Sequence, residues 1–221
     1  MKLRTNVYID GFNFYYLCVK DTKYKWLDLR KLSERMFPDD EILNIRYFTA
    51  KVFPTFKDPD KPLRQDMYLR ALATLPNFHI HLGRFAINTC MRPFAHPEDH
   101  CFRMAEVIDT KEKGSDVNLA TYLLLDCFKM GLDKVVMISN DSDLVEPVRI
   151  VKEELKLEIV VVLPLIYEKV VLDKNLRDKS NFSLMKASTS YHYIFERNLA
   201  KCQLPPVMKD EHGTINKPST W

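Results

Sequence analysis

The chain has 221 residues but only five glycines, at positions 11, 83, 114, 131 and 213. They lie too far apart to form a G-x-G-x-x-G turn or a G-x-x-x-x-G-K-[ST] loop, in which closely spaced glycines let the backbone approach phosphate. The sequence therefore disfavours a Rossmann-type dinucleotide-binding protein and a P-loop nucleotide-binding protein.

Long apolar runs and paired cysteines are also missing. No segment approaches the ~20 consecutive apolar residues that cross a bilayer, and the first nine residues hold no apolar stretch long enough for a signal peptide. The five cysteines are odd in number and widely spaced, with no C-x-x-C pair. We therefore expect reduced thiols, no contact with a membrane and a cytoplasmic location.

Charge of either sign is nearly balanced, with 33 Lys and Arg against 30 Asp and Glu and a net charge of +3. This balance permits contact with a polyanion but does not single one out. The length and the 46% hydrophobic content suit one large domain. We expect that domain over residues 1–197, with an irregular insertion at about 86–104 and an extended, proline-containing tail over 198–221 that is either a packed arm or a loose end.

The order of the expected elements indicates an α/β fold. Apolar periodicity predicts strands and helices over the following segments. Strands are expected at residues 4–10, 42–53, 78–85, 134–140 and 157–164, and helices directly after residue 11 and at 28–36, 62–75, 115–131 and 143–155. Strands that alternate with amphipathic helices imply a mostly parallel sheet covered on both faces. A hairpin turning at Asp10-Gly11 is the alternative for the first segment, because Asp-Gly favours tight turns.

Acidic residues fall where these elements meet. Asp10 and Asp141 each follow a predicted strand, Asp116 opens a predicted helix, and Asp143 lies two residues beyond Asp141. In an open parallel sheet the ligand site lies beyond the carboxyl ends of the strands. Carboxylates about 4 Å apart repel by roughly 4 kcal/mol per pair at an effective dielectric near 20, so the group must protonate, spread apart or hold a cation. Oxygen ligands suit Mg²⁺ or Mn²⁺, and such a site supports phosphodiester hydrolysis.

Each acid also has a purely local explanation. Asp143 could cap a helix together with Glu146, as in a capping box, while Asp116 could only favour a helix dipole and Asp10 could only form a turn. Three separate segments that place acids at one predicted edge favour a shared site over three unrelated roles.

Two other metal sites remain open as alternatives. Asp141-Ser142-Asp143 resembles the D-x-D element of glycosyltransferases, but that interpretation leaves the remaining acids unused. Within the insertion, four side chains could bind zinc, although their spacing matches none of the common structural zinc sites. These are Cys90, His96, His100 and Cys101.

Three segments in order along the chain are YIDGFNFYY, KGSDVNLATYLLLD and MISNDSDLVEP. They resemble the signature blocks of the NYN family of PIN-like domains, in its bacterial LabA-like (DUF88) branch. The resemblance extends through RQDMYLRAL and a closing KP-S-T-W, so it covers nearly the whole chain. It implies a PIN-like αβα sandwich with a mostly parallel central sheet and a metal-dependent endoribonuclease site.

The resemblance also assigns residues. It places the catalytic and metal-binding acids at Asp10, Asp116, Asp141 and Asp143, with Asn13 as a polar companion of the first. Many relatives carry a further carboxylate six residues after the second acid, where this chain has a tyrosine, Tyr122. We therefore expect one firmly held Mg²⁺ or Mn²⁺ ion.

RNA is the partner that this resemblance implies. Basic side chains near the predicted site could contact its phosphates, and tyrosines could stack on its bases, although a solvated helix face and core packing explain the same residues. The basic candidates are Lys61, Arg64, Arg70 and Lys113, and the aromatic ones are Tyr15, Tyr16 and Tyr122. The alternative function is a non-catalytic RNA-binding or protein-interaction module with a vestigial site. The oligomeric state is not indicated.

Overall fold

The computed structural model describes residues 2–96, 98 and 103–221. A seven-stranded sheet in the order β4-β3-β2-β1-β5-β6-β7 forms the centre of the molecule, and every neighbouring pair is parallel except β3 and β4. The strands are β1 (Leu3–Asp10), β2 (Asp40–Ala50), β3 (Phe78–Pro93), β4 (Met104–Lys113), β5 (Lys134–Ile138), β6 (Glu158–Ile166) and β7 (Ser190–Ile194).

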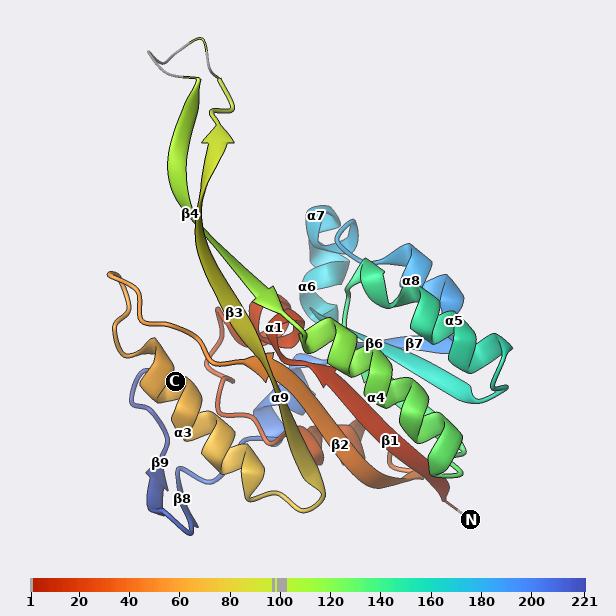
Figure 1. Cartoon of the computed structure of the whole chain (residues 1–221). Coiled ribbons are helices and arrows are strands. Elements are labelled where there is room, and N and C mark those ends of the chain that lie inside the picture. The colour runs from red at the N-terminus through yellow and green to blue at the C-terminus, as the bar shows by residue number, and fades with distance from the viewer. Residues whose placement is uncertain (1, 97, 99–102) are drawn as a thin grey trace.

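Helices cover both faces of this sheet (Figure 1). One face carries α4 (Ser115–Lys129), α5 (Val145–Glu153) and α8 (Phe182–Ala187). The other carries α1 (Gly11–Phe14), the π-helix η1 (Tyr15–Val19), α2 (Leu29–Met36), α3 (Lys61–Ala73) and α9 (Glu196–Lys201). The structure also has the short helices η3 (Ser142–Leu144), α6 (Tyr167–Leu172) and α7 (Lys174–Arg177). The αβα sandwich predicted from the sequence is confirmed.

Strand periodicity explains the two layers. Side chains alternate across β1, so that Tyr8 packs under α4 while Val7 and Ile9 pack on the opposite side. The central strand β5 is buried throughout and β6 is buried from its second residue onward, as expected for a parallel sheet covered on both sides. No helix in the described part of the chain is long and apolar enough to span a membrane.

The chain passes from β1 directly into a helix at Gly11, so the hairpin alternative is wrong. A Cβ atom at this position would lie 2.6 Å from Cζ of Tyr47 and 2.8 Å from the carbonyl oxygen of Phe48. Only glycine lets the first helix start this close to β2. The packing of this turn fixes where Asp10 lies.

The segment 86–104 differs from the irregular insertion expected. Residues 86–93 continue β3, and β4 pairs with them antiparallel from Arg84 opposite Lys113 to Pro93 opposite Met104. The resulting hairpin projects from the body of the protein (Figure 1). It has few neighbours that would impose an apolar pattern, which is why the sequence did not reveal it. His100 and Cys101 of the zinc alternative lie outside the described residues.

The C-terminal segment packs against the domain, so it is a packed arm and not a loose end. Strands β8 (Val207–Asp210) and β9 (Gly213–Asn216) form a small hairpin beside α3. Trp221 packs edge-on against Trp26 and Tyr68, with ring centroids 6.3 and 5.6 Å apart. Arg70 donates from Nε and Nη2 to the carboxylate of Asp210, at 2.8 and 2.6 Å. This ion pair joins α3 to the tail.

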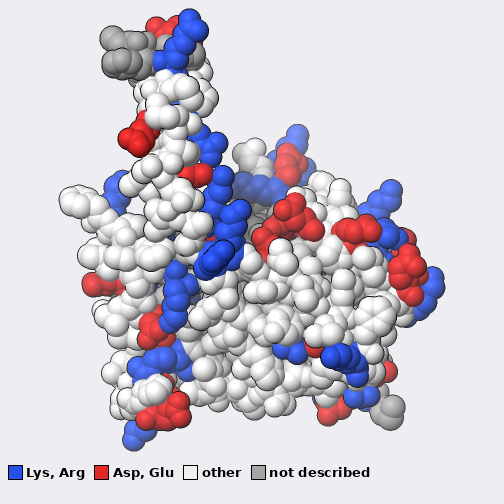
Figure 2. Space-filling view, viewed as in Figure 1, with Lys and Arg blue, Asp and Glu red and all other residues white. Residues whose placement is uncertain are grey.

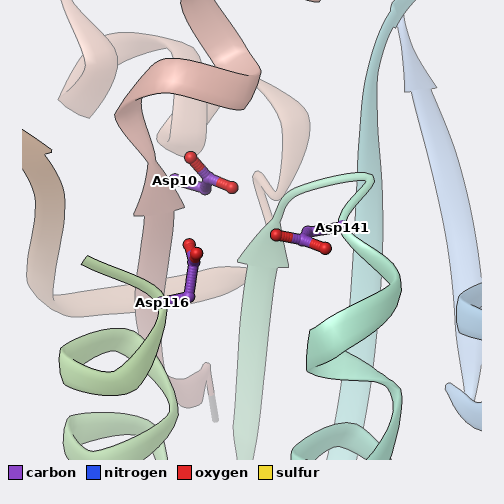
Figure 3. Close-up of side chains that lie close together, drawn as sticks. All are labelled: Asp10, Asp116 and Asp141. Carbon is purple, nitrogen blue, oxygen red and sulfur yellow. The ribbon is translucent and has the colours of Figure 1, made fainter. Parts of the chain in front are cut away.

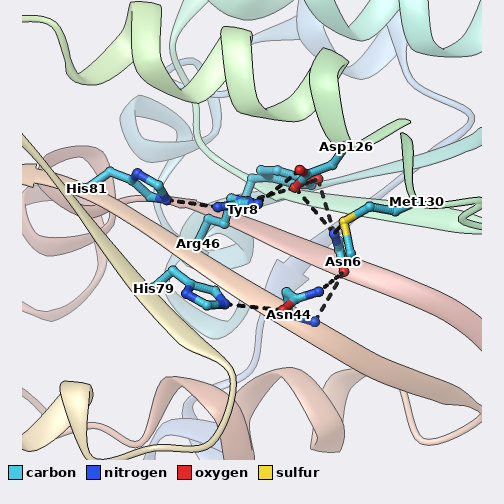
Figure 4. Close-up of polar contacts among 8 residues, drawn as sticks. All are labelled: Asn6, Tyr8, Asn44, Arg46, His79, His81, Asp126 and Met130. Carbon is cyan, nitrogen blue, oxygen red and sulfur yellow. Dashed lines mark hydrogen bonds and ion pairs between the residues drawn. The ribbon is translucent and has the colours of Figure 1, made fainter. Parts of the chain in front are cut away.

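A buried polar network holds α4 on the sheet (Figure 4). Asp126 of α4 accepts hydrogen bonds from Nε and Nη2 of Arg46 at 2.6 and 2.9 Å and from the Tyr8 hydroxyl at 2.8 Å. Arg46 also donates from Nη1 to Nε2 of His81, at 3.1 Å. Burial and the neighbouring guanidinium lower the pKa of His81 to about 4, so the ring is neutral at pH 7. The network fixes α4, and with it Asp116, relative to β1, β2 and β3.

Tyr122 belongs to the same layer. Its ring lies 4.1 Å from the ring of His81 between centroids, and the Arg46 guanidinium lies 4.7 Å from its centroid. Tyr122 therefore packs between α4 and the sheet, where it contributes no ligand to a metal.

Candidate metal centre

Three carboxylates meet at the carboxyl edge of the sheet (Figure 3). Asp10 ends β1, Asp116 lies in the first turn of α4, and Asp141 follows β5 directly before η3. One oxygen from each lies within 4.8 Å of the others. The described residues contain no other group of at least three such potential ligands. The three segments thus converge, as expected from the positions of their acids at strand ends and at a helix start.

Asp10 is the most deeply held of the three, with 5% of its surface exposed. Its Oδ1 accepts the backbone N–H of Asn13 at 3.0 Å, and its Oδ2 accepts the Ser139 hydroxyl at 2.9 Å. Burial raises the pKa of Asp10 above its ordinary range, and repulsion from Asp141 adds to this effect, while both hydrogen bonds oppose it. The carboxylate is thus oriented by the α1 turn and by the end of β5.

Asp141 also has a structural role in its own loop. Its Oδ1 accepts the backbone N–H of Asp143 at 3.0 Å, and its own N–H donates to the Ser139 hydroxyl at 3.1 Å. Ser139 therefore bonds both to Asp10 and to Asp141, which aligns the two acids. The local capping role considered from the sequence belongs to Asp141, and it coexists with the shared site.

Asp116 has no hydrogen-bond partner for its carboxylate among the described residues. Burial, followed by repulsion from Asp10, Asp141 and other nearby acids, raises its pKa from an ordinary 3.8 to about 6. Asp116 is consequently the acid whose charge is least compensated by the protein. A cation would remove that cost directly.

Asp143 and Asn13 lie at the edge of this cluster. Asp143 is exposed and is not one of the three converging acids, although its charge contributes to the raised pKa of Asp116. Asn13 accepts the backbone N–H of Asn140 at Oδ1, 3.1 Å away. It therefore joins the turn after β1 to the loop after β5 instead of pointing its side chain only at Asp10.

Glu112 is an acid near the site that the sequence analysis missed. It lies on β4, and its Oε1 accepts both the backbone N–H and the hydroxyl of Ser115, at 3.2 and 2.8 Å. Its charge raises the pKa of both Asp10 and Asp116. Gly83 makes room for it, since a Cβ there would lie 2.3 Å from Oε1. An acid three residues before the helix-opening Ser115 was the available signal.

The four basic residues expected to contact RNA do not form one surface. Lys113 is exposed at the end of β4, next to the start of α4, and lies opposite the exposed Arg84 of β3. Arg64 forms an ion pair with Asp58, and Arg70 pairs with Asp210. Lys61 lies 3.4 Å from the Tyr16 hydroxyl. Figure 2 shows Lys and Arg side chains gathered over the base of the β3–β4 hairpin, beside a group of acidic side chains.

Substituting Asp116→Asn should stabilise the metal-free protein at pH 8 by a few degrees in Tm, where ~1 kcal/mol corresponds to about 2–4 °C in a chain of this size. Because the folded-state pKa of Asp116 is raised to about 6, the wild type loses stability as pH rises from about 4 to 6 and carries the full cost above that range. The gain should vanish near pH 4, where the carboxyl is protonated. Thermal melts in EDTA across this range measure it.

The exposed Asp39 offers a matched control, because the described residues provide no partner for its side chain. Asp39→Asn should leave Tm within about a degree at both pH values. A lower Tm for Asp116→Asn at pH 8 would show that Asp116 stabilises the fold and would contradict the charge-crowding account.

This chain is similar to known proteins in sequence and in fold. The NYN domain family model matches residues 4–190. The protein 6-hydroxy-3-succinoylpyridine 3-monooxygenase HspA of Pseudomonas putida is 32% identical in an alignment with a length of 245, which covers 99% of this chain and 75% of that protein. A crystal structure of a protein of unknown function from Vibrio parahaemolyticus superposes with a TM-score of 0.54 at 15% identity, covering 92% of this chain and 97% of that one. That likeness concerns the fold alone.

The family match contains all three converging acids and the β-strands that carry or precede them. It agrees with the resemblance seen in the sequence, while assignment to the LabA-like branch stays a prediction. Because the match spans most of its length, the chain belongs to the NYN domain family.

Proposed function

We propose that this chain is a metal-dependent ribonuclease that hydrolyses RNA phosphodiester bonds with Mg²⁺ or Mn²⁺ held by Asp10, Asp116 and Asp141. The observation that supports this most strongly is the convergence of three carboxylate oxygens within 4.8 Å of one another. No Lys, Arg or His among the described residues forms an ion pair with any of them, so no cationic side chain of this part of the chain neutralises their charge.

The donor set fits such an ion. All three ligands are hard carboxylate oxygens, which Mg²⁺ and Mn²⁺ prefer over the nitrogen and sulfur ligands typical of zinc. A divalent cation bound there would polarise a phosphate oxygen and lower the pKa of an attacking water. Asp116, with a pKa of about 6, is ionised at neutral pH and gains most from the cation.

The surrounding residues would orient the ligands. Ser139 holds Asp10 and Asp141 through one hydroxyl, and Asn13 keeps the two strand ends together. Asp143 lies at the exposed rim of the site. Its carboxylate would contact a bound ion through a water molecule, or accept a proton from that water. Glu112 adds negative charge on the side of β4, and we assign it to the rim as well.

We place the phosphate backbone of the RNA over Lys113 and Arg84. They lie opposite each other at the base of the hairpin, next to the turn that leads into Asp116, and the described residues give neither a carboxylate partner. Arg64 and Arg70 already pair with acids of this chain, so their charges are largely neutralised. Phosphate contacts of this kind position a strand without reading its sequence.

A second candidate function follows from the relative of Pseudomonas putida, which is named as a monooxygenase of a substituted pyridine. The identity of 32% over 99% of this chain favours it. In that case the same fold would serve a small aromatic compound, and the metal-loaded protein would leave RNA intact. The non-catalytic module considered from the sequence predicts intact RNA too, but with RNA still bound.

Incubation with a panel of labelled RNAs tests the proposal. The wild type should cleave at least one RNA with Mg²⁺ or Mn²⁺ and none in EDTA, and Asp116→Asn should reduce cleavage by at least a hundredfold, because it removes one ligand charge. Asp116 is the most informative position, since its carboxylate has no structural hydrogen bond to lose. Asp39→Asn should cleave like the wild type. Cleavage that persists in EDTA, or that survives Asp116→Asn, would exclude the metal mechanism.

RNA binding should weaken with salt through Lys113 and Arg84. Each neutralised phosphate contributes roughly −0.7 to the slope of log K against log salt for single strands, so the double substitution Lys113→Ala, Arg84→Ala should flatten that slope by about 1.4. Salt titrations with Ca²⁺ in place of Mg²⁺ measure binding without turnover. Arg64→Ala with Arg70→Ala is the matched pair and should leave the slope unchanged. The opposite pattern would place the strand over α3.

A further inference from the structure

A cavity on the α3 side of the sheet lies next to the metal centre. Its lining comes from α1, η1, β2 and α3, and it includes Gly11, the residue after Asp10. Aromatic side chains make up much of the wall: Phe12, Tyr15, Tyr16, Tyr68 and Trp221. A mostly apolar, aromatic cavity with a few polar groups is the usual form of a small-molecule site.

Two hydroxyl groups that line this cavity have no hydrogen-bond partner in the described part of the chain. Tyr47 and Thr49 of β2 both line it, with only 6% and 2% of their surfaces exposed. Neither hydroxyl has a hydrogen-bond partner among the described residues. Neither oxygen is among the fully buried unpaired atoms of the described residues, so each stays open to a hydrogen bond from water or from a ligand in the cavity.

All charged side chains that line the cavity are basic. Lys25, Lys61 and Arg64 line it, and none of the lining residues is Asp or Glu. Arg64 is neutralised by Asp58, whereas the described residues offer no carboxylate to Lys25 or Lys61. A ligand with an acidic group would therefore be favoured, although the neighbouring metal centre is strongly negative.

The volume of the cavity limits which ligands can fit. The cavity has a volume of about 70 Å³. One water needs roughly 10–15 Å³ by this measure, so the space holds about five to seven groups of that size. That suits a single six-membered ring and is small for a fused purine.

We propose that this cavity binds one six-membered aromatic ring that carries an acidic group, with the ring against Tyr15 and Trp221, the Tyr47 hydroxyl as a hydrogen-bond partner and Lys61 on the acid. The ring could belong to a free aromatic carboxylic acid or to a pyrimidine nucleotide. The site does not depend on the proposed ribonuclease activity, since it uses none of the metal ligands.

Binding is measured on the full chain in EDTA by calorimetry and by tryptophan fluorescence, because Trp221 lines the cavity. Nicotinate and uridine 5′-monophosphate are the probes, and nicotinamide and uridine are their uncharged counterparts. At least one acid should bind saturably and about tenfold more tightly than its counterpart, while adenosine 5′-monophosphate should bind more weakly than the uridine nucleotide. Saturation by nicotinate alone indicates a free aromatic acid, and saturation by the uridine nucleotide indicates a nucleotide site.

Variants locate the binding. Lys61→Ala should weaken it about tenfold, and Tyr47→Phe should weaken it severalfold without lowering Tm, since it removes only an unpaired hydroxyl. Lys57→Ala, an exposed lysine outside the cavity, should have no effect. The proposal is overturned if neither acid saturates the protein, or if Lys61→Ala and Tyr47→Phe both bind like the wild type.

Discussion

Crowding of like charges at the carboxyl edge of the sheet is the constraint to which the rest of the site responds. The Ser139 hydroxyl donates to the Asp10 carboxylate and accepts the backbone N–H of Asp141, and each of the two carboxylates also accepts a backbone N–H at the start of the helix that follows it. These hydrogen bonds offset part of the repulsion. Asp116 receives no such bond, and its pKa rises to about 6. The protein thus stabilises two of the three carboxylates by hydrogen bonds and gives the third none among the described residues.

Holding Asp116 against that repulsion requires a firmly seated helix. At the other end of α4, Asp126 accepts bonds from Arg46 and Tyr8 in the layer between helix and sheet. A buried ion pair contributes little net stability by itself, but losing one partner is expensive, so it fixes one arrangement strongly. We interpret this network as the anchor that keeps α4 in register with β1 and β2. His81, held neutral with a pKa of about 4, completes the anchor without adding charge.

Much of this architecture could be predicted from the sequence, because strand and helix periods and the acids at their ends are local signals. The strand-to-helix step at Asp10, the capped α2 helix and the convergence of the three acids followed from such signals. The β3–β4 hairpin could not be predicted, since its exposed faces carry no core pattern, and Glu112 was missed with it. Arg70 was expected to contact RNA because its ion-pair partner, Asp210, lies far away in the sequence. Only the folding of the tail brings the two side chains together.

The division of roles across the sheet edge is a consequence of the same topology. Asp10, the last residue of β1, belongs to the acidic cluster, and the next residue, Gly11, lines the aromatic cavity. The negative cluster and the positively charged cavity therefore lie on either side of one turn. Chemistry at the carboxylates and recognition of a ring can therefore be separated by substitutions on opposite faces of the sheet. This arrangement lets each of the two proposed sites be tested while the other stays intact.

The central claim is that Asp10, Asp116 and Asp141 together hold one divalent cation. The most direct measurement is a crystal structure of the protein soaked in Mn²⁺, with anomalous diffraction used to locate the metal. The account predicts a single strong peak bound by one oxygen from each of the three acids, at about the 2.0–2.2 Å expected for such ions. An absence of metal between these acids at millimolar Mn²⁺, or a peak bound at other residues, would contradict it.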